Sequence, residues 1–535
     1  MSSVSSASDL RKQEVAQPMR TEDPEEKFMF DWDNNQPKSW LCGCFSFLVQ
    51  LILLAATGSF LFGFNLSLLN TSISYIGWEY KWCDFKLGKE EVTGCTAYKN
   101  YAAFISTAVF IGAATGSMGG GVFMMFGRRG MCLISMVVFL FGIIASVCAN
   151  SFPALLWARL LCGLGVGLIS VCCPTYMSEV TPANVRGKFG VFHQLFVTVG
   201  ILAGTLLGLP LALKTPIPSL DDAIAVNLPD GTKVKMLDEI DTFSRIWWRI
   251  MLGIGILPVI LTTYLMGFVY KFETPYYYME KQSPKDTERL LQMIMEKDDV
   301  ASELLYIKES VETSQAAKAA GMTLSQAWKA RKDYRWVIFF GCLLSAFQQL
   351  GGINVFISSS NKLFEDAGLS GKWPTIVSNI TMFVNCIMTI PAVPLIEKLG
   401  RRTLLLIGTC GMTVSVGPAA ICYWALEDGS KVTQWLAIVG CVCFIICFAA
   451  TYGPILWVYL FEIYPISISS AAAGSATACN WVAGIIMVFV TAYLDNKVSY
   501  LVFFIMCGIS ALVVFFWMKE TKGRPLGDSP FITEG

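Results

Sequence analysis

The sequence is poor in histidine and in charge. One residue of 535 is histidine, and Asp, Glu, Lys and Arg together make up 15% of the chain. Lysine plus arginine equals aspartate plus glutamate, at 40 each, so there is no basic excess that would attract nucleic acid. A single histidine excludes a histidine-rich metal site. We therefore expect no metal, no cofactor and no nucleic-acid partner.

A cleavable signal peptide is also missing from the start of the chain. Residues 1–38 are polar and of mixed charge, without a basic start followed by a short apolar core. We expect this tail to be disordered, because it offers little apolar surface to bury. The first membrane helix is then expected to act as the insertion signal.

Hydrophobic residues make up 54% of the chain, too many for a soluble globule of this length. They gather in runs of roughly twenty residues, the length that crosses a bilayer as a helix. The runs lie near 45–69, 101–124, 131–149, 154–177, 189–212, 246–270, 335–361, 372–395, 403–424, 434–460, 470–494 and 499–517. The sequence therefore predicts an all-α membrane protein with twelve transmembrane helices, and the lipid bilayer as its surroundings.

Short basic loops all fall on one side of this helix count. They are Gly127-Arg128-Arg129, Arg186-Gly187-Lys188, Lys398 to Arg402 and Lys519 to Arg524. Because cytoplasmic loops are enriched in lysine and arginine, this side and both termini are expected to be cytoplasmic. The predicted division is a tail at 1–44, a six-helix bundle at 45–272, an amphipathic helical linker at 273–334, a second bundle at 335–517 and a tail at 518–535. The apolar positions of the linker pattern are Leu290, Leu291, Ile294, Leu304, Leu305, Ile307 and Val311.

Loop motifs recur at a spacing of about half the chain. Gly127-Arg128-Arg129 recurs as Gly400-Arg401-Arg402, and Glu179 recurs as Glu462. More loosely, Glu273-Thr274-Pro275 recurs as Glu520-Thr521-Lys522. Three ordered pairs at similar spacing indicate two parallel six-helix repeats around an axis normal to the membrane.

The charge-free run from Trp336 to Asn361 contains three amide side chains, Gln348, Gln349 and Asn354. Hydrocarbon offers amides no partner, so they should face a bundle interior or a watery cavity. Residues 349 and 354 lie about one and a half helical turns apart, so the three amides converge only if the helix unwinds at Gly351-Gly352. A neutral polyhydroxylated solute such as a sugar would satisfy them. The alternative is that they bind neighbouring helices together.

These motifs, in this order, resemble the sugar porter family of the major facilitator superfamily over residues 45–530. The resemblance is carried by Pro174 to Glu179 with Arg186-Gly187, by Glu397 to Arg402, by Gln348-Gln349 with Gly352-Ile353-Asn354, and by Gly453 to Trp457. Further stretches, most similar to hexose transporters of apicomplexan parasites, are His193 to Phe196, Tyr452 to Trp457, Asn480 to Val482 and Glu520 to Gly523. The resemblance implies the major facilitator fold, with two pseudo-symmetric six-helix bundles, and transport of a hexose by alternating access.

The resemblance also implies which side chains contact the sugar. They are Gln194 on helix 5, Gln348, Gln349 and Asn354 on helix 7, Asn385 on helix 8, Trp457 on helix 10 and Asn480 on helix 11. Amides donate and accept hydrogen bonds as hydroxyls do, and tryptophan offers a flat apolar face. The residues expected to support the pocket are Phe62, Asn65, Phe448 and Trp481, whose rings could equally be ordinary core aromatics.

Charged side chains at the cytoplasmic helix ends are expected to form a gate. They are Glu179, Arg186, Glu462, Arg128, Arg129, Glu397, Arg401 and Arg402. We expect them to bridge the two halves when the carrier faces outward and to separate when it faces inward. The enrichment of basic residues in cytoplasmic loops explains part of the number of arginines at these helix ends, but it does not explain the presence of Glu179 and Glu462. Members of the family usually carry a charged residue at the positions of Met124, Tyr277 and Ser469, and this chain does not. We therefore expect fewer charged contacts in this network than is usual for the family.

Proton-coupled sugar porters resembling this chain carry an aspartate on helix 1, where Asn65 stands here. An amide cannot titrate, so the expected mode is uniport, with a proton-coupled symporter as the alternative. Arg159, the usual partner of that acid, remains and must bind a carbonyl or glutamate. His193 is expected to form a hydrogen bond rather than to couple protons.

Cysteines are numerous, at 18, but most lie inside apolar runs, where thiols act as small buried hydrophobes. Cys83 and Cys95 differ, because they flank a polar loop placed outside the cell, where a disulfide is permitted. Whether they pair remains open.

Two further classes of protein are considered. A membrane receptor that senses sugar without moving it would usually carry a long cytoplasmic effector tail, whereas this chain ends soon after Arg524. No cluster of His, Cys or carboxylates has catalytic spacing at membrane depth, so we do not expect an enzyme. The default expectation is a monomer in the plasma membrane, and the amides suit several hexoses alike.

Overall fold

The computed structural model describes residues 32, 46–82, 96–123, 126–182, 185–214, 224–227, 233–236, 240–319, 328–329, 332–426, 430–465, 468–524 and 529–532. Cys83, Cys95 and Met124 lie outside the described residues. The described part is dominated by long apolar helices.

The N-terminal half is built from the helices that precede the linker. They are α2 (Phe47–Ser67), α3 (Leu69–Glu79), α4 (Thr96–Phe123), α5 (Arg128–Cys148), α6 (Phe152–Val180), α7 (Arg186–Leu206), α8 (Leu209–Lys214), α9 (Thr242–Gly253), α10 (Ile256–Tyr264) and the π-helix η4 (Leu265–Val269). Between α8 and α9 an antiparallel pair of short strands, β1 (Ile224–Asn227) and β2 (Lys233–Met236), extends from the helical body. The all-α expectation did not include this hairpin.

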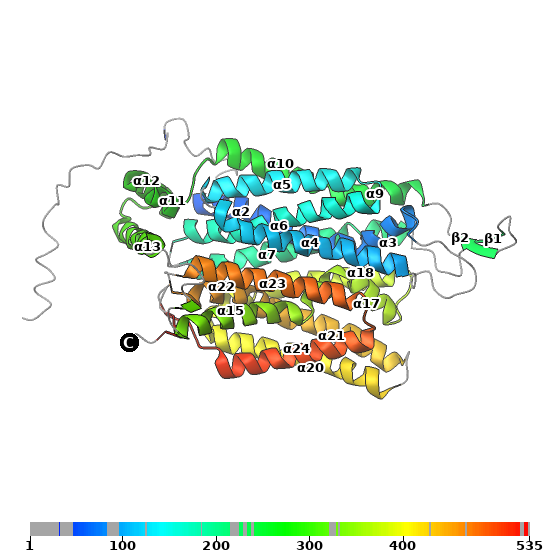
Figure 1. The fold of residues 1–535 in the computed structure, drawn as a ribbon. Helices are drawn as coiled ribbons and strands as arrows, with labels where there is room; N and C mark the ends of the chain where they lie inside the picture. Colours follow the sequence, from blue (N-terminus) through cyan, green and yellow to red (C-terminus); the bar gives the residue numbers. More distant parts are fainter. Residues whose placement is uncertain are drawn as a thin grey trace, which may run out of the picture.

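The C-terminal half follows three linker helices, α11 (Pro275–Glu280), α12 (Pro284–Met295) and α13 (Ala301–Ala319). It consists of α15 (Lys332–Leu350), α16 (Ile353–Ser358), α17 (Ser360–Asp366), α18 (Trp373–Thr389), α19 (Ala392–Leu399), α20 (Arg401–Ala425), α21 (Lys431–Ala450), α22 (Tyr452–Ile463), α23 (Ser469–Thr491) and α24 (Asn496–Trp517). The two halves lie side by side with their helices roughly parallel, the linker helices at one end and the β1–β2 hairpin at the other (Figure 1).

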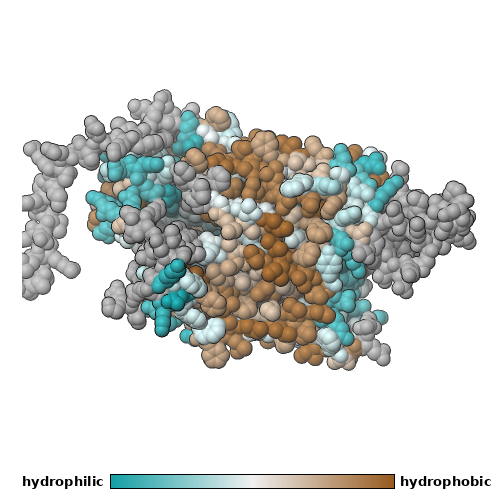
Figure 2. Space-filling view, in the orientation of Figure 1, coloured by the Kyte–Doolittle hydropathy of each residue, from teal (hydrophilic) through white to brown (hydrophobic). Residues whose placement is uncertain are grey.

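Eleven described helices are long and apolar enough to cross a membrane. The pair α18 and α19, bent by 45° at Ile390-Pro391, makes twelve if it is counted as one span. Proline lacks an N–H and its ring clashes with the preceding turn, which accounts for the bend. On the face shown in Figure 2, a band of hydrophobic surface lies between two hydrophilic ends. The prediction of a twelve-helix membrane protein is therefore confirmed.

Within the N-terminal half, α2 and α7 cross at very close range. A Cβ atom built on Gly63 would lie 1.9 Å from the carbonyl oxygen of Val197, and one on Gly200 would lie 2.0 Å from that of Phe60. The two glycines therefore let the backbones touch, as small residues do in membrane helix pairs. This crossing holds the central part of α2 against α7, the helix that carries Gln194.

The linker has a small core of its own, formed by apolar faces of α11, α12 and α13. Its buried members include Leu291, Ile307 and Val311, as the amphipathic pattern predicts. Leu305 was expected on the same face but is 57% exposed, so that part of the prediction is wrong. The helix turns Leu305 away from the core side on which Ile307 lies.

Two tail residues pack against the end of the molecule that carries the linker helices, although the N-terminal tail was expected to be disordered. The indole of Trp32 is buried, donates a 2.5 Å hydrogen bond to Asp286 on α12 and lies 5.9 Å from the ring of Phe272. In the C-terminal tail, Phe531 is buried with its ring 5.3 Å from that of Phe340. Each tail is therefore anchored by one aromatic side chain to its own half.

Candidate functional site

The amides predicted on helices 7 and 11 converge in the C-terminal half. The side chain of Asn480 on α23 donates to Gln348 Oε1 at 2.8 Å and to the backbone oxygen of Ser345 at 2.9 Å. It accepts from Gln349 Nε2 at 2.8 Å, and Gln349 in turn accepts from the amide of Asn354. All four amide side chains are at least 93% buried. Four of the seven predicted sugar contacts thus form one connected amide cluster.

The break between α15 and α16 makes this cluster possible. Gly352 adopts a left-handed conformation with φ of 94°, and α16 begins at the next residue. The unwinding places Asn354 within hydrogen-bond reach of Gln349, as predicted from the glycine pair. A Cβ on residue 352 would lie 2.6 Å from the ring of Phe503. Glycine is therefore required there both by its backbone angle and by space.

The three other side chains predicted to contact the sugar, Asn385, Gln194 and Trp457, have polar atoms that can still form hydrogen bonds. Asn385 on α18 is buried, and its side-chain oxygen has no partner among the described residues. The described contacts of Gln194 and Trp457 likewise include no side-chain hydrogen bond. A Cβ built on Gly453 would lie 3.2 Å from Gln194 Nε2 and 3.2 Å from the ring of Phe448, so Gln194 of α7 reaches across to α22. These groups come from both halves.

Aromatic rings join the two halves beside these amides. Phe62 on α2 lies 5.6 Å from Trp481 on α23, and Phe110 on α4 lies 6.0 Å from the same indole. Trp481 is buried, and its N–H has no partner among the described residues. Phe448 stacks on Tyr452 with the ring centroids 6.4 Å apart. Phe110 was not predicted, because a lone phenylalanine in an apolar run carries no signal.

Near these rings, two polar residues of the N-terminal half lie deep in the bundle. Nδ1 of His193 is 2.8 Å from the hydroxyl of Ser59, a hydrogen bond as expected for this residue. Arg159 is only 1% exposed and donates from Nη2 to the backbone oxygen of Asn65 at 3.1 Å. Its Nε and the side-chain oxygen of Asn65 have no hydrogen-bond partner in the described structure. The arginine therefore binds a carbonyl, one of the two partners foreseen for it.

At the end of the molecule that carries the linker helices, the N-terminal half has a compact ion-pair network. Arg128 lies 2.9 Å from Glu179 of α6 and 2.7 Å from Glu280 of the linker. Thr274 donates to the same Glu179 at 2.5 Å. Tyr277, which stands where the family usually has an arginine, has the Arg128 guanidinium 5.9 Å above its ring. The network ties α5, α6 and the start of the linker together.

The C-terminal half repeats this arrangement almost group for group. Arg401 lies 2.7 Å from Glu462, and Thr521 donates to that glutamate at 2.5 Å. Glu520 accepts the backbone N–H groups of Arg401 and Arg402 at 2.9 and 3.0 Å, as Glu273 accepts those of Arg129 and Gly130 at 3.0 and 3.2 Å. The internal repeat proposed from the loop motifs therefore has a structural counterpart.

The two capping glutamates differ in their electrostatics. Burial raises the pKa of Glu273, and the two backbone N–H groups do not fully offset it. Burial also acts to raise the pKa of Glu520, but four backbone N–H groups outweigh it and hold the pKa below the usual range. Hydrogen bonds to the charged form account for this difference. Glu520 therefore stays ionised in its site over a wider pH range than Glu273.

In the described structure these pairs do not bridge the two halves, as the predicted gate would when the carrier faces outward. Arg128 pairs with Glu179 and Glu280, and Arg401 pairs with Glu462, so each ion pair lies within one half or joins it to the linker. The side chains of Arg129 and Arg402 donate to backbone oxygens instead, those of Met266 and Phe515. Glu397 is exposed, and no ion pair of it is found in the described structure. Arg186 begins α7, and its side chain lies outside the described part.

A polar cluster at the opposite end does join the halves, and it was missed in the sequence. Asn70 on α3 donates to Ser360 and to Ser378 at 2.9 Å each, and its oxygen accepts the backbone N–H of Asn361 at 3.1 Å. Asn361 also donates to Thr71 of α3 at 3.1 Å. All of these side chains lie within or beside predicted helices, and the polar run 358–361 was the signal that could have revealed them.

Comparison with known proteins gives a consistent family match. A model for the family "Sugar (and other) transporter" matches residues 51–530. Hexose transporter 1 of Toxoplasma gondii is 38% identical over 92% of this chain and 83% of that protein. Hexose transporter 1 of Plasmodium falciparum is 37% identical over 94% and 95%. The glucose transporter GlcP of Staphylococcus epidermidis is 28% identical over 79% and 86%.

Among solved structures, the chain is similar to a proton:xylose symporter of the major facilitator superfamily, XylE, bound to 6-bromo-6-deoxy-D-glucose. The TM-score is 0.73 at 23% identity, covering 90% of this chain and 98% of that one. At this identity the likeness concerns the fold, which is that of the major facilitator superfamily. The two-bundle architecture expected from the sequence is confirmed.

Breaking one of the ion pairs at the linker end should cause a measurable loss of stability. Glu462→Gln keeps an acceptor for Thr521 but leaves Arg401 without its carboxylate in a partly buried site. We expect a destabilisation of about 1 to 3 kcal/mol, seen as a lower midpoint of thermal unfolding in detergent. Glu397→Gln, at an exposed carboxylate, should leave the midpoint unchanged. Equal midpoints for Glu462→Gln and the unmodified protein would contradict the role of this pair.

The polar cluster around Asn70 predicts faster local opening when it is broken. Asn70→Ala leaves Ser360, Ser378 and Asn361 short of partners at a buried contact between the halves. Backbone amides of α17 should then exchange with deuterium about 10- to 100-fold faster, because a loss of about 1 to 3 kcal/mol raises the open population by that factor. The control is Asn100→Ala, which removes an exposed 2.9 Å hydrogen bond between α4 and Tyr493, two residues after the end of α23. If the deuterium exchange of α17 is unchanged in Asn70→Ala, the polar cluster does not hold the two halves together at this end.

Proposed function

Because this chain belongs to the sugar transporter family, we propose that it is a facilitative hexose uniporter that works by alternating access of one central site. The family match spans residues 51–530. Relatives at 37–38% identity over more than nine tenths of this chain carry the name hexose transporter 1. A third relative is named a glucose transporter. These names support a hexose as the substrate class, and a transporter rather than an enzyme.

The proposed binding site lies between the halves, among groups that lack protein partners. Gln194 and Trp457 with Asn385 would bind the sugar hydroxyls and its CH face, since amides match hydroxyls and an indole offers an apolar plane. Asn65 and Trp481 contribute a further acceptor and a donor without partners in the described structure. A neutral ligand that donates and accepts hydrogen bonds is the complement of this set.

Gln348, Gln349, Asn354 and Asn480 have a second role in this proposal. Their mutual hydrogen bonds hold the amide cluster in place before the ligand arrives, so less side-chain entropy is lost on binding. Each amide still has unused donor or acceptor capacity after these bonds, because a carboxamide offers two donors and two lone pairs. The helix-binding role and the ligand role of these amides are therefore compatible.

Passive transport is supported by the distribution of carboxylates. In the described membrane spans, the acidic residues are Glu179, Asp333 and Glu397, each within a turn or so of a cytoplasmic helix end. Arg159 has a carbonyl oxygen rather than an acid beside it. Coupling to a proton needs a group that gains and loses the proton on the transport path. This distribution is the observation that carries the proposal of uniport over symport.

Alternating access would require the halves to separate at one end at a time. The cluster around Asn70 closes the end opposite the linker, where it would act as the outer gate. The ion-pair networks hold each half together as a rigid unit on the cytoplasmic side, so that the halves can rock as bodies. We place both termini in the cytoplasm, the protein in the plasma membrane and the working unit as a monomer.

Removing a free amide should weaken sugar binding without unfolding the protein. Gln194→Ala and Asn385→Ala each leave a sugar hydroxyl unpaired, costing roughly 1 to 3 kcal/mol, or about 10- to 100-fold in affinity for hexose. Thermal midpoints should stay near that of the unmodified protein. Gln349→Ala should lower both affinity and midpoint, because Asn480 and Asn354 then lose partners.

The matched control is Gln434→Ala, an amide at the far end of α21, about 20 Å along the helix from Phe448. It should bind hexose as the unmodified protein does. Unchanged affinity in both Gln194→Ala and Asn385→Ala would refute the proposed site.

Reconstituted vesicles separate the passive from the driven mode. Purified protein in liposomes should equilibrate labelled glucose to the outside concentration and no further. An imposed proton gradient should change neither the final level nor the initial rate at fixed outside pH. Accumulation above the outside level in the presence of the gradient would establish the proton-coupled symporter instead. If other, unlabelled hexoses do not compete with labelled glucose for transport, that result would contradict the substrate class.

A further inference from the structure

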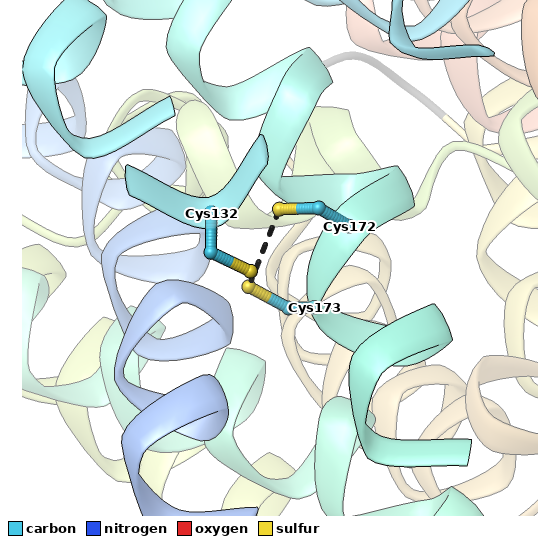
Figure 3. Close-up of side chains that lie close together, drawn as sticks. All are labelled: Cys132, Cys172 and Cys173. Carbon is cyan, nitrogen blue, oxygen red and sulfur yellow. Dashed lines mark hydrogen bonds between the residues drawn. The ribbon is translucent and has the colours of Figure 1, made fainter. Parts of the chain in front are cut away.

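Three buried thiols meet where α5 packs on α6, away from the proposed sugar site. Cys132 comes from α5, and Cys172 and Cys173 come from α6. Their sulfur atoms all lie within 4.8 Å of one another, and each residue is at most 1% exposed. The side chains point toward a common centre from the two helices (Figure 3). The sequence suggested only packing for these residues, because Cys132 is far from the adjacent pair Cys172 and Cys173 along the chain.

The spacing of the sulfur atoms suits one small thiophilic centre. Bonds of about 2.3 Å from a central atom to each thiolate place sulfur atoms about 4 Å apart in a trigonal arrangement. The sulfur atoms of Cys172 and Cys173 are 3.9 Å apart, and the third lies within reach. Small side-chain rotations would bring all three onto a common atom.

The surroundings of the three thiols are apolar and uncharged. Cys173 packs against Gly58 of α2, next to the side chains of Met136 and Ile169. The hydroxyl of Ser135 lies 3.6 Å from Cys172 Sγ and already donates to the backbone oxygen of Met131 at 2.8 Å. The described contacts of these thiols include no charged side chain. Any occupant must therefore leave the site close to electrically neutral, since net charge at membrane depth is costly.

The net charge of the occupied site distinguishes between the thiophilic atoms or ions that could bind there. Three thiolates carry three negative charges, so a monovalent or divalent metal ion bound by all three leaves a net negative site, whereas a trivalent centre leaves none. We propose that Cys132, Cys172 and Cys173 form a binding site for a trivalent thiophilic metalloid, of the class of arsenite.

The binding reaction balances without any redox step. Arsenite at neutral pH is the uncharged trihydroxide As(OH)₃. Three As–O bonds break and three As–S bonds form, and each thiol proton passes to a departing hydroxide to give water. Arsenic stays trivalent and the sulfurs stay in the thiolate state, so no oxidant or reductant is needed. Neutral reactants give a neutral product, which is the condition the apolar surroundings impose.

The site lies near the cytoplasmic end of the helices, which gives a route of entry. Cys132 is one turn from Arg128, about 6 Å along α5. Cys172 and Cys173 lie about two turns from Glu179 on α6. The Arg128–Glu179 pair closes the helix ends above them. Opening of this pair would admit a small uncharged molecule.

Direct binding tests the proposal without reference to sugar transport. The full-length protein, purified with reduced thiols, is incubated with sodium arsenite and separated from free arsenite, and bound arsenic is measured by elemental analysis. We expect one arsenic per chain, with X-ray absorption showing sulfur neighbours only and none of the original oxygens. Serine variants of Cys132, Cys172 or Cys173 should each lose the bound arsenic.

Two control variants make the test specific. Cys441→Ser removes a lone buried thiol of α21, and Cys342→Ser removes one member of the thiol pair Cys342 and Cys479 in the other half. Both should keep the bound arsenic. Loss in Cys342→Ser with retention in Cys173→Ser would move the site to that pair and overturn the proposal. Oxygen remaining on the bound arsenic of the unmodified protein, or no binding, would also overturn it, and this result needs no variant to fold.

Discussion

Polar side chains inside a bilayer must find their hydrogen-bond partners in the protein or in a bound solute, because the hydrocarbon supplies none. Because of this constraint, the buried polar side chains around the proposed sugar site form two groups. Gln348, Gln349, Asn354 and Asn480 satisfy one another and hold a broken helix in position. Asn385 and Trp481 have buried polar atoms that lack partners in the described structure. A scaffold whose amides are already paired, set beside groups that await a partner, is the arrangement expected of a preorganised site for a neutral polar ligand.

The two ends of the molecule also differ in the partners that their polar side chains find. At the end that carries the linker helices, matching sets of ion pairs, glutamate caps and threonine hydrogen bonds stabilise each half separately. At the other end, neutral amides and hydroxyls join the halves through Asn70. A contact made of neutral hydrogen bonds can be exchanged for water at modest cost when it opens. Rigid halves joined by a separable neutral contact are what rocking between two states requires.

Much of this could be predicted from the sequence, and the failures have physical causes. Twelve spans followed from apolar runs, and the unwound segment followed from Gly351-Gly352, because both depend on local composition. The individual partners of Arg128 and Arg401 could not be predicted: loop charges indicate a side of the membrane, but only the packed helix ends decide which carboxylate lies nearest. Asn70 and the thiols of Cys132, Cys172 and Cys173 were not found, since their contacts depend on residues distant in the chain. Leu305 showed that a periodic pattern alone does not fix which turn of a linker helix faces the core.

The central claim is that a neutral hexose binds between the halves, against the free amides and the paired amide cluster. A cryo-electron microscopy structure of the protein with saturating glucose tests it most directly. The account predicts density for one sugar between α7 and the C-terminal half, within hydrogen-bond distance of Gln194 and Asn385, with the Gln349–Asn480 hydrogen bond still in place. Sugar density elsewhere, or an amide cluster that excludes any ligand from the space between the halves, would contradict it.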